Sequence, residues 1–90
     1  MRGVQIDFLI QTELSLCLVE VKRQKKIGRE VIDEVMQKCK CLPRPRGMAL
    51  RTALVYDGEL AKSVVASGYF DAVVSSEELL GLAGGEGGNG

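Results

Sequence analysis

Residues 14–22 read Leu-Ser-Leu-Cys-Leu-Val-Glu-Val-Lys, an apolar run that ends in charged residues. Such a run is typical of a central strand that is buried on both faces. Just before it, residues 4–10 read Val-Gln-Ile-Asp-Phe-Leu-Ile, and the alternation of Val4 to Phe8 is typical of another strand. Only residues 11–13 separate the two runs, so the sequence predicts an antiparallel hairpin.

The chain after this hairpin alternates between helical and strand patterns. Apolar side chains recur every three or four residues from Ile27 to Leu42, which predicts a helix over residues 28–42, and two prolines then end it. Glu34 and Lys38, four residues apart, are expected to pair with each other on the outer side of this helix. The remaining pattern predicts strands over 51–56 and 71–75, a helix over 60–67 closed by Gly68, a turn at Asp57-Gly58 and a last helical stretch from residue 76. The order β-β-α-β-α-β predicts an α/β fold, a mixed sheet with helices packed on it.

Length and composition fit one small domain. The chain has 90 residues, of which we expect 1–83 to form the domain and 84–90, with five glycines, to be a disordered tail. The sequence contains neither a run of about 20 apolar residues nor a signal-peptide pattern. It lacks histidine, which excludes imidazole-based catalysis. Its three cysteines, an odd number, argue against a disulfide framework and for a cytoplasmic setting, with Cys17 expected in the core.

Zero net charge conceals a strong asymmetry along the chain. Residues 22–51 hold ten cations and three anions, a balance of +7, and the other residues balance it with two cations and nine anions. Such a domain can present a basic face to a polyanion. A solvated surface with a basic loop would explain the same charges. The candidate phosphate-binding residues are Arg23, Lys25, Lys26, Arg29, Arg44 and Arg46.

Three charged residues interrupt the apolar hairpin. If its strands pair across the short turn, Asp7 lies beside Glu20, and alternation places Lys22 on the same side and turns Val21 into the core. Two neighbouring carboxylates repel unless a divalent cation lies between them, and a nearby lysine can stabilise an oxyanion. This combination suits metal-assisted phosphodiester hydrolysis. Alternatively, Asp7 is a surface residue at a strand edge and Glu20 and Lys22 form an exposed charge set.

Asp7, followed after thirteen residues by Glu20-Val21-Lys22, resembles the core motif of the PD-(D/E)XK nuclease superfamily. The runs Gly-Val-Gln-Ile-Asp-Phe-Leu-Ile, Leu-Val-Glu-Val-Lys-Arg, Gly-Arg-Glu-Val and Thr-Ala-Leu-Val-Tyr are more similar to the nuclease-like domain at the C-terminus of certain prokaryotic AAA-type ATPases. The resemblance covers about residues 3–80 and implies a restriction-endonuclease-like core.

The resemblance also implies roles for individual residues. Asp7 and Glu20 would bind Mg²⁺ or Mn²⁺, the Val21 carbonyl would be a backbone ligand, and Lys22 would be the catalytic lysine. The substrate would be nucleic acid, DNA in preference to RNA. Ile6 replaces the family's proline, and the family's opening helix and first strand have no counterpart here. We therefore expect a homodimer, or a missing N-terminal segment of a longer protein, to cover the sheet.

Two functions follow as expectations. The first is a metal-dependent nuclease domain that is accessory to a larger ATPase. The second is a catalytically silent module of the same fold that binds nucleic acid or dimerises. A generic α/β domain without a polyanion partner would instead scatter its basic residues over opposite faces.

Overall fold

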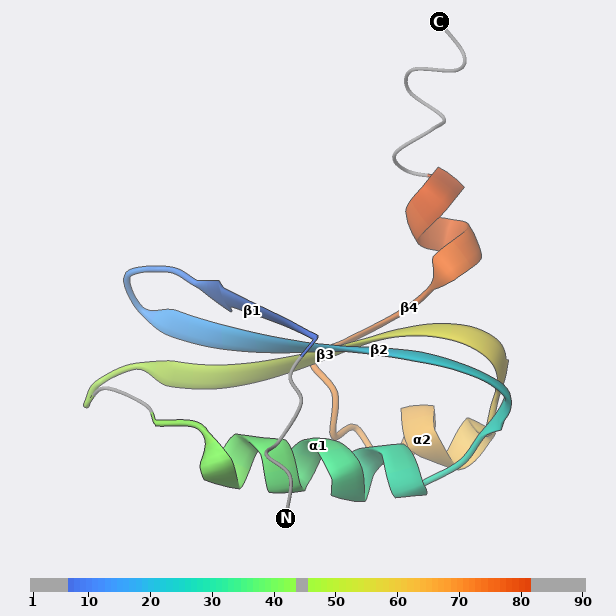
Figure 1. The fold of residues 1–90 in the computed structure, drawn as a ribbon, viewed down its shortest axis with the longest axis horizontal. Coiled ribbons are helices and arrows are strands. Elements are labelled where there is room, and N and C mark those ends of the chain that lie inside the picture. The colour runs from blue at the N-terminus through green and yellow to red at the C-terminus, as the bar shows by residue number, and fades with distance from the viewer. Residues whose placement is uncertain (1–6, 44–45, 82–90) are drawn as a thin grey trace, which may run out of the picture.

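Four strands form one mixed sheet in a computed structural model that describes residues 7–43 and 46–81 (Figure 1). They are β1 (Phe8–Gln11), β2 (Ser15–Ile27), β3 (Ala49–Leu60) and β4 (Ala72–Ser75), in the spatial order β1-β2-β3-β4. β1 is antiparallel to β2, whereas β2 and β3, and β3 and β4, are parallel. The prediction of an α/β fold with a mixed sheet is confirmed.

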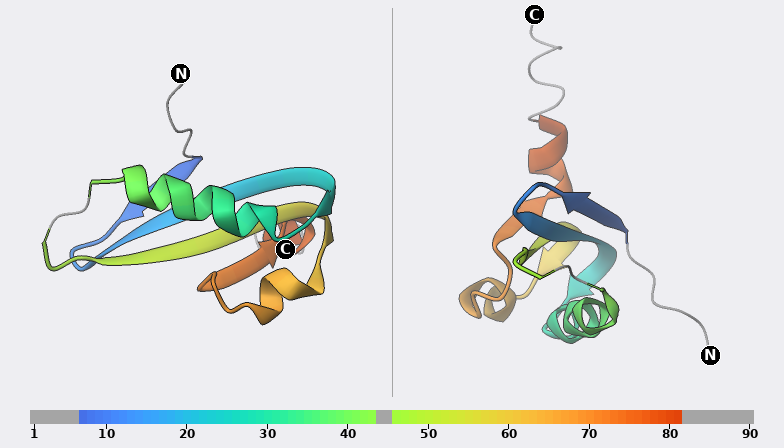
Figure 2. Two further views of the ribbon diagram at one scale, coloured as in Figure 1. Left: turned by 90° about the horizontal axis from the view of Figure 1, so that it is seen from below. Right: turned by 90° about the vertical axis from the view of Figure 1, so that its left-hand side faces the viewer.

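Two helices connect the parallel strands and cover the same face of the sheet (Figures 1 and 2). α1 (Glu30–Cys41) links β2 to β3, and α2 (Lys62–Ala66) links β3 to β4. A further helical segment begins at Ser76 and stands on the other side of the sheet. In residues 7–43 and 46–81 no helix is long and apolar enough to cross a bilayer.

The core lies between the sheet and these two helices. The predicted apolar face of α1 is confirmed, because Val31 and Val35 are fully buried against Leu18 of β2 and Leu54 of β3. Gly68, with a φ of 69°, follows α2 as predicted. The buried cluster consists of Leu18, Ile27, Val31, Ile32, Val35, Leu54, Val64 and Phe70.

β3 does not turn at Asp57-Gly58, where the sequence predicts a turn. It continues to Leu60, and β2 continues beside it to Ile27. Asp57 is in register with Arg23 and Glu59 with Lys26, so two residues of β2 lie opposite Gly58 alone. This is a β-bulge, and the positive φ of Gly58, 135°, is a conformation that allows the strand to continue.

The helices cover the face of β2 that carries Glu20, whereas the sequence predicts that the Val21 face lies in the core. Leu16, Leu18 and Glu20 are buried beneath the helices, whereas Val21 is half-buried on the opposite face. Cys17 is also only half-buried, so the expectation of a core thiol was wrong. All three cysteines lie in the described part of the chain, and each is a free thiol. Residues 4–6 of the predicted first strand and the predicted tail lie outside the described residues.

The last helical segment begins with a reciprocal pair of hydrogen bonds. The Glu78 amide donates to Ser75 Oγ at 3.0 Å, and the Ser75 amide donates to Glu78 Oε1 at 2.9 Å. This capping box lowers the pKa of Glu78, first through the bond from the backbone amide and then through the side chain. Because the folded pKa is depressed, the stabilisation is present above the ordinary carboxyl pKa and is lost as the pH falls through the lowered value.

Acidification is therefore expected to weaken the hydrogen bonds at the start of this helical segment. The measurement is hydrogen exchange of the Ser75 amide across acidic pH, after correction for the intrinsic exchange rate. Protection should fall as Glu78 is protonated. Glu78→Gln is the matched control, because glutamine accepts the same bond without titrating. Equal pH dependence in the two proteins would contradict this account.

Candidate functional site

The β1–β2 hairpin brings the predicted carboxylates together. Thr12 closes the turn, since its hydroxyl oxygen accepts bonds from the amides of Leu14 and Ser15 at 3.3 and 3.0 Å. Phe8 is then in register with Val19, which places the preceding residue, Asp7, next to Glu20. The amide of Val21 donates to Asp7 Oδ2 at 2.9 Å and fixes this carboxylate at the edge of β2.

These residues and two helical residues line one small hollow of about 380 Å³. Its lining consists of Asp7, Glu20, Val21, Lys22, Glu34 and Lys38. The predicted set of Asp7, Glu20 and Lys22 thus shares one site, which lies at the junction of β1, β2 and α1. The last two lining residues come from α1 and are absent from the candidates drawn from the sequence.

Two ion pairs cross from β2 to α1 in this site. Lys38 Nζ lies 2.7 Å from Glu20 Oε1, and Lys22 Nζ lies 2.6 Å from Glu34 Oε1. The sequence predicts instead that Glu34 and Lys38, four residues apart, pair with each other on the outer side of the helix. They bind β2 because four residues make about one turn of helix, so both side chains lie on the face that contacts the strand.

Burial distinguishes the two pairs. The Glu20 side chain is only 4% exposed and its partner Lys38 17%, whereas Glu34 is 43% exposed. The site holds three carboxylates, with Asp7, and two ammonium groups, which leaves one net negative charge when all are ionised. A low-dielectric site with a negative balance attracts cations.

The oxygen atoms suit Mg²⁺ or Mn²⁺ better than a softer metal. Carboxylate and carbonyl oxygens are the preferred ligands of these ions, and Mg²⁺ commonly takes one or two carboxylates and fills its other positions with water. Within residues 7–43 and 46–81, no three Cys, Asp or Glu side chains gather closely enough to hold a metal ion. A cation bound by Asp7 and Glu20 would therefore need backbone oxygen and water as well.

None of the described candidate phosphate-binding residues lines this hollow. Lys25 and Lys26 are exposed near the end of β2, roughly 10–13 Å beyond Lys22 at about 3.3 Å per residue. Arg29, also exposed, precedes α1 and donates to the Ser63 carbonyl at 3.4 Å. Arg46 follows the other end of α1, a helix of 12 residues that is about 18 Å long.

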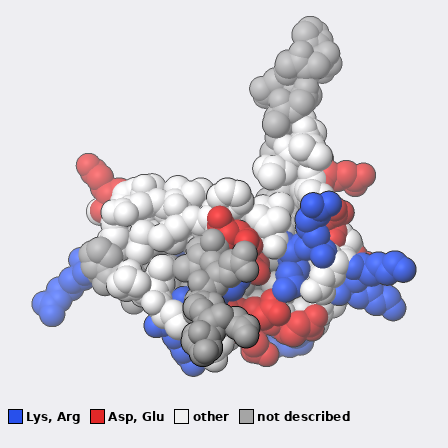
Figure 3. All heavy atoms as spheres, in the orientation of Figure 1, with Lys and Arg blue, Asp and Glu red and all other residues white. Residues whose placement is uncertain are grey.

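The two remaining candidates differ from these. Arg23 lies on the other face of β2, where it pairs with Asp57 at 3.7 Å, and Arg44 lies outside the described residues. Figure 3 shows cations toward both ends of the molecule and acidic groups both between them and beside them at each end. The basic stretch of sequence is therefore divided in space by α1.

No protein-family model, curated protein or solved structure matches this chain. The candidate site therefore depends on its own residues and their geometry.

Proposed function

We propose that this domain is a metal-dependent nuclease with a restriction-endonuclease-like core, which hydrolyses phosphodiester bonds in DNA and is accessory to a larger cytoplasmic ATPase. The observation that supports the proposal is the shared hollow of Asp7, Glu20, Val21 and Lys22, because two carboxylates and a lysine from neighbouring strands are what this chemistry requires. The resemblance to PD-(D/E)XK nucleases motivates the same roles.

Each charged residue of the hollow would have its own role in the reaction. Asp7 and Glu20 would hold Mg²⁺ or Mn²⁺, which when bound offsets charge on the phosphate oxygens. Lys22, which pairs with Glu34, would hydrogen-bond the attacking water or a phosphate oxygen. Lys38 shields the charge of Glu20, and since an ammonium group has three donors, it can keep this bond and still contact the substrate.

Replacing Lys22 with alanine is expected to reduce cleavage by about 10²–10⁴-fold, the usual contribution of a group that transfers or orients a proton. The assay follows labelled duplex, branched and single-stranded DNA with Mg²⁺, with Mn²⁺ and with EDTA. Lys62→Ala is the matched control, because this lysine is exposed on α2, does not line the hollow and is not among the candidate phosphate-binding residues. Circular dichroism checks that both variants fold. Cleavage by Lys22→Ala at the wild-type rate, or cleavage by the wild type in EDTA, would contradict the proposal.

A second candidate is a catalytically silent module that binds nucleic acid. The two ion pairs between β2 and α1 favour this candidate. Glu20 and Lys22 already have partners at 2.7 and 2.6 Å, so a metal ion or a substrate would compete with these partners. This candidate gives DNA binding that weakens steeply with salt as counterions are released. It would be supported by binding without cleavage under every metal condition of the same assay, and by weaker binding of a Lys25→Ala/Lys26→Ala variant.

A further inference from the structure

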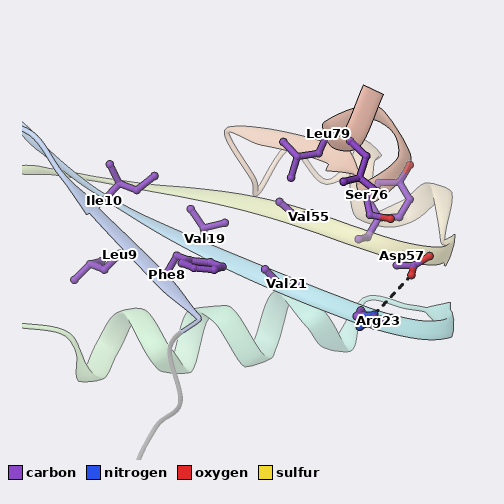
Figure 4. A pocket seen from close by; sticks show the side chains of 12 residues that line it. Phe8, Leu9, Ile10, Val19, Val21, Arg23, Val55, Asp57, Ser76 and Leu79 are labelled. Atoms are coloured by element: carbon purple, nitrogen blue, oxygen red, sulfur yellow. Dashed lines mark ion pairs between the residues drawn. The ribbon is translucent and has the colours of Figure 1, made fainter. Parts of the chain in front are cut away.

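The sheet face opposite α1 and α2 is an exposed apolar surface (Figure 4). It forms a hollow of about 630 Å³, with Phe8 and Ile10 from β1, Val19 and Val21 from β2, and Val55 from β3. The last helical segment borders it through Leu79 and Leu80. We call this surface the open face.

The open face is too large and too apolar for an ordinary solvated surface. Phe8, Ile10 and Leu80 are 60%, 54% and 70% exposed, and Leu79 is nearly half exposed. Together with the half-buried Val19, Val21 and Val55, these side chains offer roughly 400 Å² of apolar area, since a large aromatic buries about 150–250 Å² and an aliphatic side chain somewhat less. Contiguous apolar patches of this size mark interaction sites.

We propose that the open face is the contact surface of a homodimer, in which two copies of this chain pack their sheets face to face about a two-fold axis. An interface of standard size buries about 800 Å² of each partner, a little over half of it nonpolar. The apolar area of the open face matches that requirement for one half of a symmetric dimer. In such a dimer each copy supplies the same surface.

The charges around the open face favour a second copy over a charged partner. One cation, Arg23, and one anion, Asp57, line the hollow and pair with each other at 3.7 Å while remaining 78% and 55% exposed. In a two-fold dimer, Arg23 of one copy can lie near Asp57 of the other copy, so the charges of the two rims are complementary. It offers little to a polyanion or to an anionic membrane, which attract surfaces with an excess of cations.

Packing of the two sheet faces would cover the apolar surface, whereas pairing of strand edges would not. The edge strands β1 and β4 have only four residues each, so edge-to-edge pairing would form few hydrogen bonds and leave the apolar face in water. Packing of two sheet faces covers Phe8, Ile10 and Val21 together.

Sedimentation velocity across the micromolar range tests the proposal with three proteins. The wild type should sediment as a concentration-dependent dimer of twice 9.7 kDa. Ile10→Lys should raise the dimer dissociation constant about thirtyfold or more, because it places a charge among the apolar side chains of the interface. Val65→Lys is the matched control, because Val65 is 57% exposed but lies on α2, on the other side of the sheet. It should dimerise like the wild type.

Labelling of cysteines gives a second readout that does not depend on mass. Cys17 is in register with Ile10 and, by strand alternation, lies on the open face, whereas Cys41 is exposed at the end of α1. Peptide-resolved alkylation should show Cys17 protected in the wild type and labelled faster in a folded Ile10→Lys variant, with Cys41 unchanged. A wild-type monomer overturns the proposal. An Ile10→Lys variant that still dimerises also overturns it.

Discussion

Replacing Lys38 with methionine is expected to lower the free energy of unfolding by about 3–5 kcal/mol. The Glu20 carboxylate is 4% exposed and has Lys38 as its ion-pair partner at 2.7 Å, so the substitution leaves a buried charge without compensation. A domain of this size has roughly 4–12 kcal/mol of total stability, at about 0.05–0.15 kcal/mol per residue. The loss is therefore a large fraction of the stability of the whole domain.

Urea unfolding followed by circular dichroism measures this effect. The matched control is Asp57→Asn, which removes an exposed ion pair with Arg23 and should cost less than about 1 kcal/mol. A double variant, Glu20→Leu/Lys38→Met, should recover most of the stability, because two packed apolar side chains replace both charges. The double variant also decides the matter if the single variant does not fold. A single variant as stable as the wild type would show that Glu20 is not buried with Lys38 in solution.

Only part of the strand geometry at the candidate site could be predicted from local rules. Alternation along β2 places Lys22 on the same side as Glu20. The register is not fixed in this way, because a turn at residues 11–13 would set Ile10 opposite Leu14, whereas the hairpin sets Gln11 opposite Leu16 and so brings Asp7 beside Glu20. The helix face of Val31 and Val35 follows from its own periodicity.

The identity of the covered face could not be predicted in this way. β2 carries apolar side chains on both sides, Leu16 and Leu18 on one and Val19 and Val21 on the other, so its pattern does not indicate which side the helices cover. A charged Glu20 on the covered side contradicts the simple expectation. It is accommodated there only because Lys38 reaches it from α1.

The ion pairs of the site and the distribution of the basic residues could not be predicted, because both depend on how distant elements pack together. The spacing of Glu34 and Lys38 indicates a pair within the helix, and nothing local indicates that Lys22 and Glu20 lie across from them. In the same way, a run of cations in the sequence does not form one surface when α1 separates Arg29 from Arg46.

The predicted turn at Asp57-Gly58 was wrong for another reason, because a glycine can allow a bulge as well as a turn. Arg23 is in register with Asp57 and Lys26 with Glu59, so the chain passes through the pair without reversing. The glycine is required here by its neighbour, since a Cβ on Gly58 would overlap the carbonyl oxygen of Gln24. Its φ of 135° is also rare for any residue with a side chain.

Gly58→Ala is therefore expected to destabilise the domain by about 3–5 kcal/mol, since backbone strain of about 1–3 kcal/mol adds to the displacement of the neighbouring strand. Two other glycines separate these causes. Gly68 has a positive φ of 69° but open space around its Cβ position, so Gly68→Ala should cost about 1–2 kcal/mol. Gly81 has neither feature and lies in the last helical segment, so Gly81→Ala should be neutral or slightly stabilising. Urea unfolding of all three variants gives the comparison, and a Gly58→Ala cost no larger than that of Gly68→Ala would show that β2 and β3 do not approach each other this closely at the bulge.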